Sequence, residues 1–226
     1  MEIPLFPLPN LVLFPQVAVP LHIFEERYKL MINRCIDQDA IFGFVLLDED
    51  AEMESESTIR RVGVTARVVQ VDRLEDGRMN ILCAGESRFR IEEFTGSTPY
   101  WTGIVEFIED APERQDALQT AFDEVADLYK QAMELTSRLK ETETPDVDLP
   151  DSALGLSYMV SYVLDLAVAR KQELLESTST ILRLNALAVD LESILSQLKE
   201  QISRKGFAHK AKTNGDLGKP HGLRDH

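Results

Sequence analysis

The first half of the chain alternates short apolar runs with turn residues, a pattern typical of β-strands. Residues 17–23 alternate apolar and other side chains with a period of two, which predicts a half-buried strand. Residues 41–47 form an unbroken apolar run, which predicts a buried strand. A further strand is expected over residues 100–109. The first half therefore predicts a small barrel or a strongly twisted sheet.

The clearest local signal is a hairpin between two long β-type runs, 59–74 and 79–91. Glu75-Asp76-Gly77-Arg78 joins them, and Asp-Gly in this setting predicts a type I′ turn. One helix interrupts the strands, because Glu25 and Glu26 suit a first turn, where the helix dipole favours anions. Apolar residues follow with helical spacing: Tyr28, Ile32, Cys35 and Ile36.

The opening segment, PLFPLPNLVLFP at residues 4–15, combines large apolar residues with four prolines. Proline removes a backbone donor and fixes φ, so the segment is predicted to be neither a helix nor a central strand. It also differs from a secretory signal, which has a basic start and an unbroken apolar core. We expect its prolines to limit strand pairing while its apolar side chains enter the core: Leu5, Phe6, Leu11, Leu13 and Phe14.

The second half changes to a helical pattern after Asp110-Ala111-Pro112-Glu113. One apolar stripe runs to about Lys140, and Asp151 or Ser152 can cap a following helix. A short helix is expected over 170–176. The last helix has a heptad seam over 181–202, formed by Ile181, Leu184, Ala188, Leu191, Leu195, Leu198 and Ile202. This seam is either the core face of a small helical bundle or the contact between two chains, and we favour the bundle.

Composition limits the classes of function. The net charge of −15 argues against nucleic acid, whose phosphates require clustered Lys and Arg, and against an anionic membrane surface. Membrane-spanning helices need about 20 consecutive apolar residues, and the chain has no such run. Cys35 and Cys83 lie in apolar surroundings and are expected to be buried thiols, which fits a cytoplasmic protein. Residues 205–226 are polar and are expected to form a disordered tail.

A search for catalytic motifs finds none of the common ones. The sequence contains no P-loop, no Gly-x-Ser-x-Gly elbow and no zinc motif, so no cofactor, metal or catalytic residue is predicted. His22 could act as a general base, but no nucleophile stands near it, and a structural role is favoured. The acidic run 48–56 lacks the glycine and spacing of a calcium loop. The sequence Arg88-Phe89-Arg90 suggests an anion site only weakly.

The order of these motifs resembles the N-terminal, substrate-binding domain of Lon proteases. The matching segments are PLFPLPNLVLFPQVAVPLHIFEERYKLMI at 4–32, IFGFV at 41–45, VGVTA at 62–66, DGRMNIL at 76–82, GESRFR at 85–90, KQELLE at 171–176 and Arg183-Leu184. The resemblance implies an α+β fold: a PUA-like β-barrel subdomain over residues 1–110, then a helical bundle over 111–204. It also implies protein recognition without the ATPase and peptidase modules of Lon.

Three functions follow from these observations. The first is a non-catalytic module that binds unfolded or degron-bearing proteins, as an adaptor in protein quality control with a protease or chaperone as partner. Its candidate binding residues are Phe24, as an apolar contact, with Glu25, Glu26 and Arg27 on the rim, although core packing is the favoured role of Phe24. The second is a scaffold that oligomerises through the 181–202 seam. The third, a hydrolase using His22, is the weakest.

Overall fold

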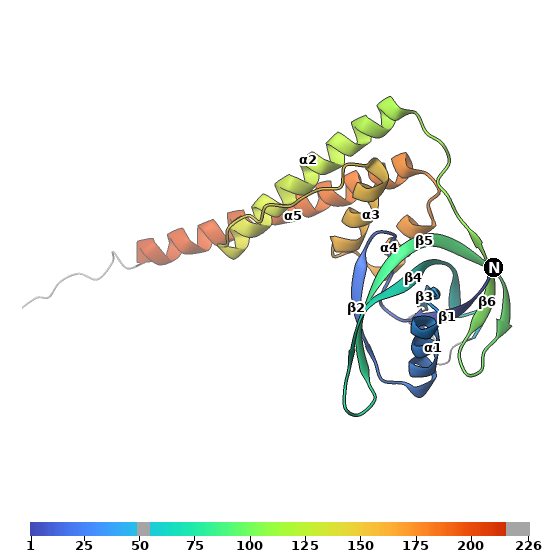
Figure 1. Ribbon diagram of the computed structural model, residues 1–226. Coiled ribbons are helices and arrows are strands. Elements are labelled where there is room, and N and C mark those ends of the chain that lie inside the picture. Colours follow the sequence, from blue (N-terminus) through green and yellow to red (C-terminus); the bar gives the residue numbers. More distant parts are fainter. Residues whose placement is uncertain (49–54, 216–226) are drawn as a thin grey trace, which may run out of the picture.

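The computed structural model describes residues 1–48 and 55–215. The elements follow in the order β1 (Glu2–Leu8), β2 (Ala18–Ile23), α1 (Glu26–Asp37), β3 (Phe42–Leu47), β4 (Ile59–Arg73), β5 (Met79–Gly96), β6 (Thr102–Phe107), α2 (Gln115–Lys140), α3 (Ala153–Val163), α4 (Val168–Glu176) and α5 (Thr180–Gly215). Figure 1 shows the strands and α1 at one end of the molecule, with α2 and α5 projecting away side by side. The predicted α+β fold, a barrel followed by helices, is confirmed.

The sheet closes into a barrel because β5 is long enough to pair with three strands. The strand order is β2-β5-β4-β3-β1-β6. An additional pairing between β5 and β6 closes the five strands from β5 to β6 into a ring. The first part of β5, Met79–Ala84, pairs with β2, and its second part, Phe89–Gly96, pairs with β6. β2 therefore lies on the outside of the closed ring as an edge strand, which suits Pro20 within it.

The opening segment corrects one prediction, because β1 is a central strand of the barrel. It pairs with β6 through Glu2–Pro4 and with β3 through Leu5–Leu8. The Leu5 amide faces β6 and donates to the Trp101 carbonyl at 2.7 Å. Since backbone groups alternate along a strand, the Pro7 nitrogen also faces the β6 side, but the pairing with β6 has already ended at Pro4. The Pro4 nitrogen faces β3 before the pairing with β3 begins. Both prolines thus occupy positions where no ladder donor is needed.

The predicted hairpin is present, but its turn is not type I′. Type I′ requires φ > 0 at both central residues, whereas Gly77 (φ +81) is the one turn residue with positive φ. The Leu74 carbonyl accepts from the Gly77 amide at 3.0 Å, and the Leu74 amide donates to the Arg78 carbonyl at 2.9 Å. The connection is therefore longer than two residues, and a single left-handed glycine closes it.

Two buried clusters lie on the two sides of the barrel sheet. Neighbouring residues of β1 divide between them, with Leu5 in the smaller cluster and Phe6 in the larger one. The smaller cluster comprises Ile3, Leu5, Val45, Ile59, Phe89, Ile91 and Val105. The larger cluster continues without a break from the barrel and α1 into the helical half, where Phe14 meets Tyr158 with ring centroids 6.2 Å apart. The two halves therefore share one core.

The heptad seam of the last helix packs against α2 of the same chain, as the favoured bundle interpretation predicts. Leu184, Leu191 and Leu195 of the seam are buried, as are Val125 and Tyr129 of α2. The two helices run in parallel, since Ala111 bonds to Thr178 near their first turns and Lys205 bonds to Leu139 near the end of α2. Helix α3, which follows α2 in the chain, is capped as predicted: the Ser152 hydroxyl accepts a hydrogen bond from the Gly155 amide at 3.0 Å.

The expected start of the tail at residue 205 is wrong. α5 continues to Gly215, because Lys and Ala in this segment have good helix propensity and elongating an existing helix avoids the cost of nucleation. The rest of that prediction, residues 216–226, lies outside the described part of the chain. Most of the acidic run at 48–56 also lies outside it, and its first residue, Asp48, binds Arg60 at 2.7 Å.

A buried ion cluster joins the barrel to the helices. The Arg88 guanidinium on β5 and the Arg183 guanidinium on α5 both bind the Asp110 carboxylate, which follows β6. Arg88 and Arg183 are 2% and 0% exposed. Both also donate to the Ser177 carbonyl, and Arg183 lies over the Tyr158 ring at 4.5 Å. The Arg88 guanidinium therefore binds groups within the protein. The anion site suggested by the sequence Arg88-Phe89-Arg90 is wrong for Arg88.

Candidate protein-binding surface

The four predicted binding residues lie where β2 turns into α1, next to the tip of the β4–β5 hairpin. We call this surface the arm-end surface, because it lies beside the tip of the long β4–β5 hairpin, which forms an arm. It comprises His22, Phe24, Glu25, Glu26, Arg27 and Arg78. The two segments meet because β2 pairs with β5 up to Ile23↔Met79, so His22 stands beside Asn80. The hairpin tip adds Arg78, whose Nη1 lies 3.5 Å from the His22 Nε2.

The Phe24 side chain is 60% exposed, which corrects the prediction of core packing. Period-two alternation places Ile23 inward, at 2% exposed, and so turns Phe24 outward at the end of β2. Its ring stacks on the His22 ring with centroids 6.1 Å apart and an interplanar angle of 26°. An exposed aromatic ring with a fixed neighbour is suited to contact with an apolar partner, since aromatic groups contribute strongly to interfaces.

The charged residues of the rim pair with close neighbours. Arg27 binds Glu25 at 2.9 Å, and Lys29 binds Glu26 at 2.8 Å. The Glu26 side chain is 90% exposed. Exposed ion pairs contribute little to stability, about 0–1 kcal/mol, so a charged ligand can replace one member at small cost. The structure thus brings Phe24, Glu25, Glu26 and Arg27 together on one surface.

His22 is held by groups that cannot act as nucleophiles. Its Nδ1 donates to the Asn80 Oδ1 at 2.7 Å, a tautomer assigned from the acceptor, and its Nε2 faces Arg78. Phe24 covers one side of the ring. This arrangement orients the ring of Phe24 and offers no support to the hydrolase hypothesis.

The edge of β2 borders the arm-end surface. The Gly85 amide donates to the Val17 carbonyl at 2.8 Å, so Val17 and, by alternation, Val19 and Leu21 direct their backbone groups toward β5. The backbone groups of Ala18, Pro20 and His22 therefore face away from the sheet. Proline offers no donor there, which discourages long strand addition while leaving the side chains around Phe24 accessible.

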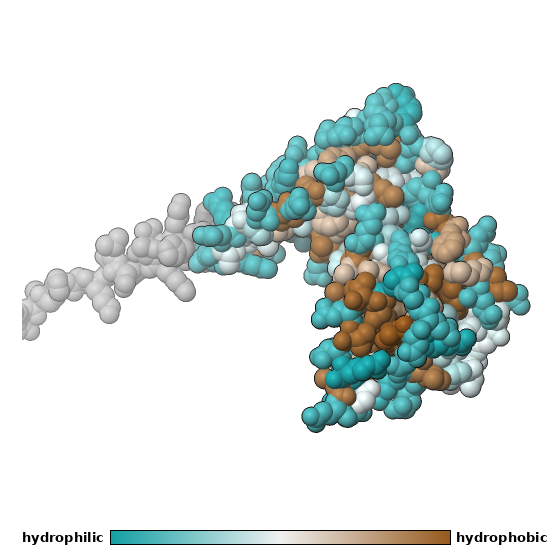
Figure 2. Space-filling view, viewed as in Figure 1, coloured by the Kyte–Doolittle hydropathy of each residue, from teal (hydrophilic) through white to brown (hydrophobic). Residues whose placement is uncertain are grey.

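A small groove between α1 and β4 was missed by sequence reasoning. Its lining combines apolar residues, Ile36, Val68, Val69 and Val71, with the polar residues Asp39, Arg67 and Gln70, and Val69 is 55% exposed. The pairing with β5 steps from Val68↔Cys83 to Gln70↔Leu82, so Val69 is the extra residue of a β-bulge. Figure 2 shows an apolar area on this side of the barrel, between β2 and α1. The sequence pattern of residues 67–71 gives no sign of the bulge.

The two cysteines are buried free thiols, as predicted. Burial raises the pKa of the Cys35 thiol to about 11 and that of the Cys83 thiol to about 12. Both remain protonated at neutral pH, so neither supplies a thiolate nucleophile. Across residues 1–48 and 55–205, no group of three His, Cys, Asp or Glu side chains is placed to hold a metal ion. In the same ranges, no helix has the length and apolar character needed to cross a membrane.

Comparison with known proteins identifies the family. Residues 2–192 match the family described as the ATP-dependent protease La (LON) substrate-binding domain. The chain belongs to the family of Lon substrate-binding domains. It is 30% identical over 211 residues to a Lon protease of Flavobacterium johnsoniae, covering 90% of this chain and 26% of that protein. It is 27% identical over 200 residues to Lon protease 2 of Herpetosiphon aurantiacus, covering 88% and 24%. The chain thus spans about a quarter of these Lon proteases.

Solved structures of Lon N-terminal domains share the fold. A Lon N-terminal domain protein from Xanthomonas campestris superposes with a TM-score of 0.59 and 22% identity, covering 84% of this chain and 98% of that one. The N-terminal domain of a Lon protease of the Mycobacterium avium complex gives a TM-score of 0.64 and 18% identity, covering 85% and 98%. At these identities the likeness concerns the fold alone.

Proposed function

We propose that this Lon substrate-binding domain binds unfolded or degron-bearing segments of client proteins at the arm-end surface, without catalysing a reaction. The observation that carries the proposal is the Phe24 ring, 60% exposed yet stacked on His22. Leaving an aromatic ring in water is unfavourable, because its full burial contributes about 1.5–3 kcal/mol. A client residue that covers the ring recovers part of that free energy.

The surroundings of Phe24 suit extended clients. The rim carries two acidic side chains, Glu25 and Glu26, and one basic side chain, Arg27, and can pair with either charge. The exposed Val69 side chain in the groove between α1 and β4 adds a further apolar contact on the barrel. Such a surface binds apolar side chains with little selectivity for the rest of the sequence, which is what recognition of unfolded chains requires.

The finer role is that of an adaptor in protein quality control, which presents clients to a protease or chaperone. Its support is the family, whose description names substrate binding in an ATP-dependent protease. The adaptor role predicts that a client bound at Phe24 remains unfolded and transferable.

The test is the affinity for a permanently unfolded protein, such as reduced and carboxymethylated lactalbumin, measured by fluorescence anisotropy. Phe24→Ala should weaken binding about tenfold, as loss of an interface aromatic does. Leu182→Ala is the matched control, because Leu182 is 66% exposed but lies on α5. Equal affinities of the wild type and Phe24→Ala would contradict the proposal.

A further inference from the structure

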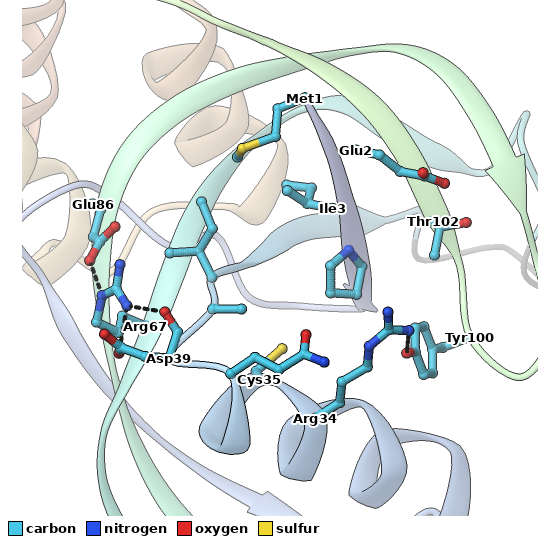
Figure 3. Close-up of a pocket in the computed structure, with 14 residues that line it drawn as sticks. Met1, Glu2, Ile3, Arg34, Cys35, Asp39, Arg67, Glu86, Tyr100 and Thr102 are labelled. Atoms are coloured by element: carbon cyan, nitrogen blue, oxygen red, sulfur yellow. Dashed lines mark hydrogen bonds and ion pairs between the residues drawn. The ribbon is translucent and has the colours of Figure 1, made fainter.

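A cavity of about 490 Å³ lies at the other end of α1 from Phe24. Residues of β1, the C-terminal turn of α1, β4, β5 and the start of β6 line it (Figure 3). Cavities of about 300–1,000 Å³ are typical of sites for small ligands or a few residues of a peptide. Because α1 has 12 residues, its two ends are about 18 Å apart, so this cavity is separate from the arm-end surface.

The acidic side chains that line the cavity are all bound to donors. Arg67 binds both Asp39 and Glu86, at 2.8 Å each, on one wall. Glu2 accepts a hydrogen bond from the Thr95 hydroxyl at 2.6 Å. These contacts give each carboxylate a hydrogen-bond donor and neutralise Arg67, while Glu2, bound to a neutral hydroxyl, keeps its negative charge.

Arg34 differs from Arg67, because no carboxylate of the described residues lies within ion-pair distance of it, and the Glu2 carboxylate of the same cavity acts on its charge only from a longer distance. Its Nη1 donates to the Tyr100 hydroxyl at 3.3 Å, and within the described ranges it forms no ion pair. Tyr100 is 5% exposed, so its ring is fixed by packing and holds the guanidinium in place. Figure 3 shows Arg34 and Tyr100 together on one side of the cavity, opposite Arg67 and Glu86. The hydroxyl can also donate its own proton to a ligand oxygen.

The rest of the lining contains an apolar wall, and Gln38 and Thr102 add polar groups to it. Ile3, Pro4 and Ile41 form the apolar wall, and Met1, 57% exposed, stands at the same wall. A guanidinium beside an apolar wall matches a ligand that carries a carboxylate at the end of an apolar group, because arginine binds carboxylates through two parallel hydrogen bonds.

We propose that this cavity binds a carboxylate attached to an apolar body, with Arg34 and Tyr100 holding the carboxylate and Ile3, Pro4 and Ile41 contacting the body. The chemistry has two sources: the free C-terminus of a protein that ends in an apolar residue, or a small free acid. The inference goes beyond the proposed function, because it concerns a second site with a defined ligand chemistry.

The test is isothermal titration calorimetry with three probes: a hexapeptide that ends in Ala-Leu with a free carboxylate, the same peptide amidated, and acetyl-leucine. We expect the amide to bind about tenfold more weakly than the acid, because a charge-assisted hydrogen bond is lost. Tighter binding of the peptide acid than of acetyl-leucine identifies protein C-termini as the source. Equal binding of these two identifies the small acid. Trp101, the single tryptophan and the neighbour of Tyr100, provides a second readout by fluorescence.

Variants assign the effect to the cavity. Arg34→Gln should weaken binding of the acid about tenfold and abolish the difference between acid and amide. Arg90→Gln, a change at an exposed arginine outside the cavity, should leave the affinity for the acid and the difference between acid and amide unchanged. Equal affinity of the wild type for acid and amide, or no saturable binding up to about 10 mM, would overturn the inference. Binding of unfolded lactalbumin by Arg34→Gln, measured in parallel, shows whether the arm-end surface acts independently.

Discussion

The Asp110 carboxylate accepts a hydrogen bond from the Arg183 guanidinium, and this contact joins the segment after the barrel to the last helix. Arg88 approaches the same carboxylate from β5. One acidic group thus compensates two buried arginines at the junction of the two halves. The halves share a core there, so the orientation of α5 relative to the barrel depends on Asp110 as well as on apolar packing.

Asp110→Asn should destabilise the protein by about 3–5 kcal/mol, because it leaves two buried guanidinium groups without a counter-charge. The free energy of unfolding from urea titration measures the effect. Asp116→Asn is the control: Asp116 pairs with Arg114 at the surface, and its loss should cost no more than about 1 kcal/mol. Similar losses in the two variants would contradict the role of the buried cluster.

The seam of α5 is predicted to stabilise a single chain rather than a dimer. Leu191→Ala should lower the free energy of unfolding by about 2–5 kcal/mol, because Leu191 is fully buried. Val189→Ala, at a position 64% exposed, should change it by less than about 0.5 kcal/mol. The molar mass of both variants, measured by light scattering, should match that of the wild type. A change of mass on Leu191→Ala would show that the seam joins two chains.

The buried thiols predict a loss of stability at alkaline pH. The pKa values of Cys35 and Cys83 rise from about 8.5 in the unfolded chain to about 11 and about 12 in the folded one. Between these values the unfolded state binds fewer protons, so the free energy of unfolding falls as pH rises above about 8.5. A double Cys→Ala variant should lose this component of the pH dependence. A profile identical to that of the wild type would contradict it.

The same burial predicts slow reaction with a thiol reagent. At pH 8 the native protein should react far more slowly with dithionitrobenzoate than the urea-unfolded protein, because the reagent requires an accessible thiolate. Absorbance at 412 nm follows the reaction. Equal rates in the two states would show that the thiols are accessible in the folded protein.

Local patterns predicted most elements correctly, and the errors have physical causes. The apolar run at 41–47, the hairpin and the Ser152 cap depend on neighbouring residues, which the sequence displays directly. The central position of β1 was missed because proline is excluded only where its nitrogen must donate, and the staggered pairing with β6 and β3 removes that need. Strand pairing between distant segments decides this, and no local pattern reports it.

The candidate surface was predicted in part. Its residues were found together because they are consecutive, but the exposure of Phe24 follows from the outward turn at the end of β2. The contacts of Arg34 with Tyr100, and of Arg88 and Arg183 with Asp110, join residues far apart in the chain. Sequence spacing cannot indicate such contacts, whereas the closed barrel brings them together.

The most direct test of client binding is photo-crosslinking from position 24. Benzoylphenylalanine in place of Phe24 should crosslink to carboxymethylated lactalbumin on irradiation, since a client that covers this ring lies within reach of the ketone. The same group in place of Leu182, which is similarly exposed but lies on α5, should give little product. Strong crosslinking at 182 and none at 24 would contradict the account, because the client would then contact the helices and leave the arm-end surface free.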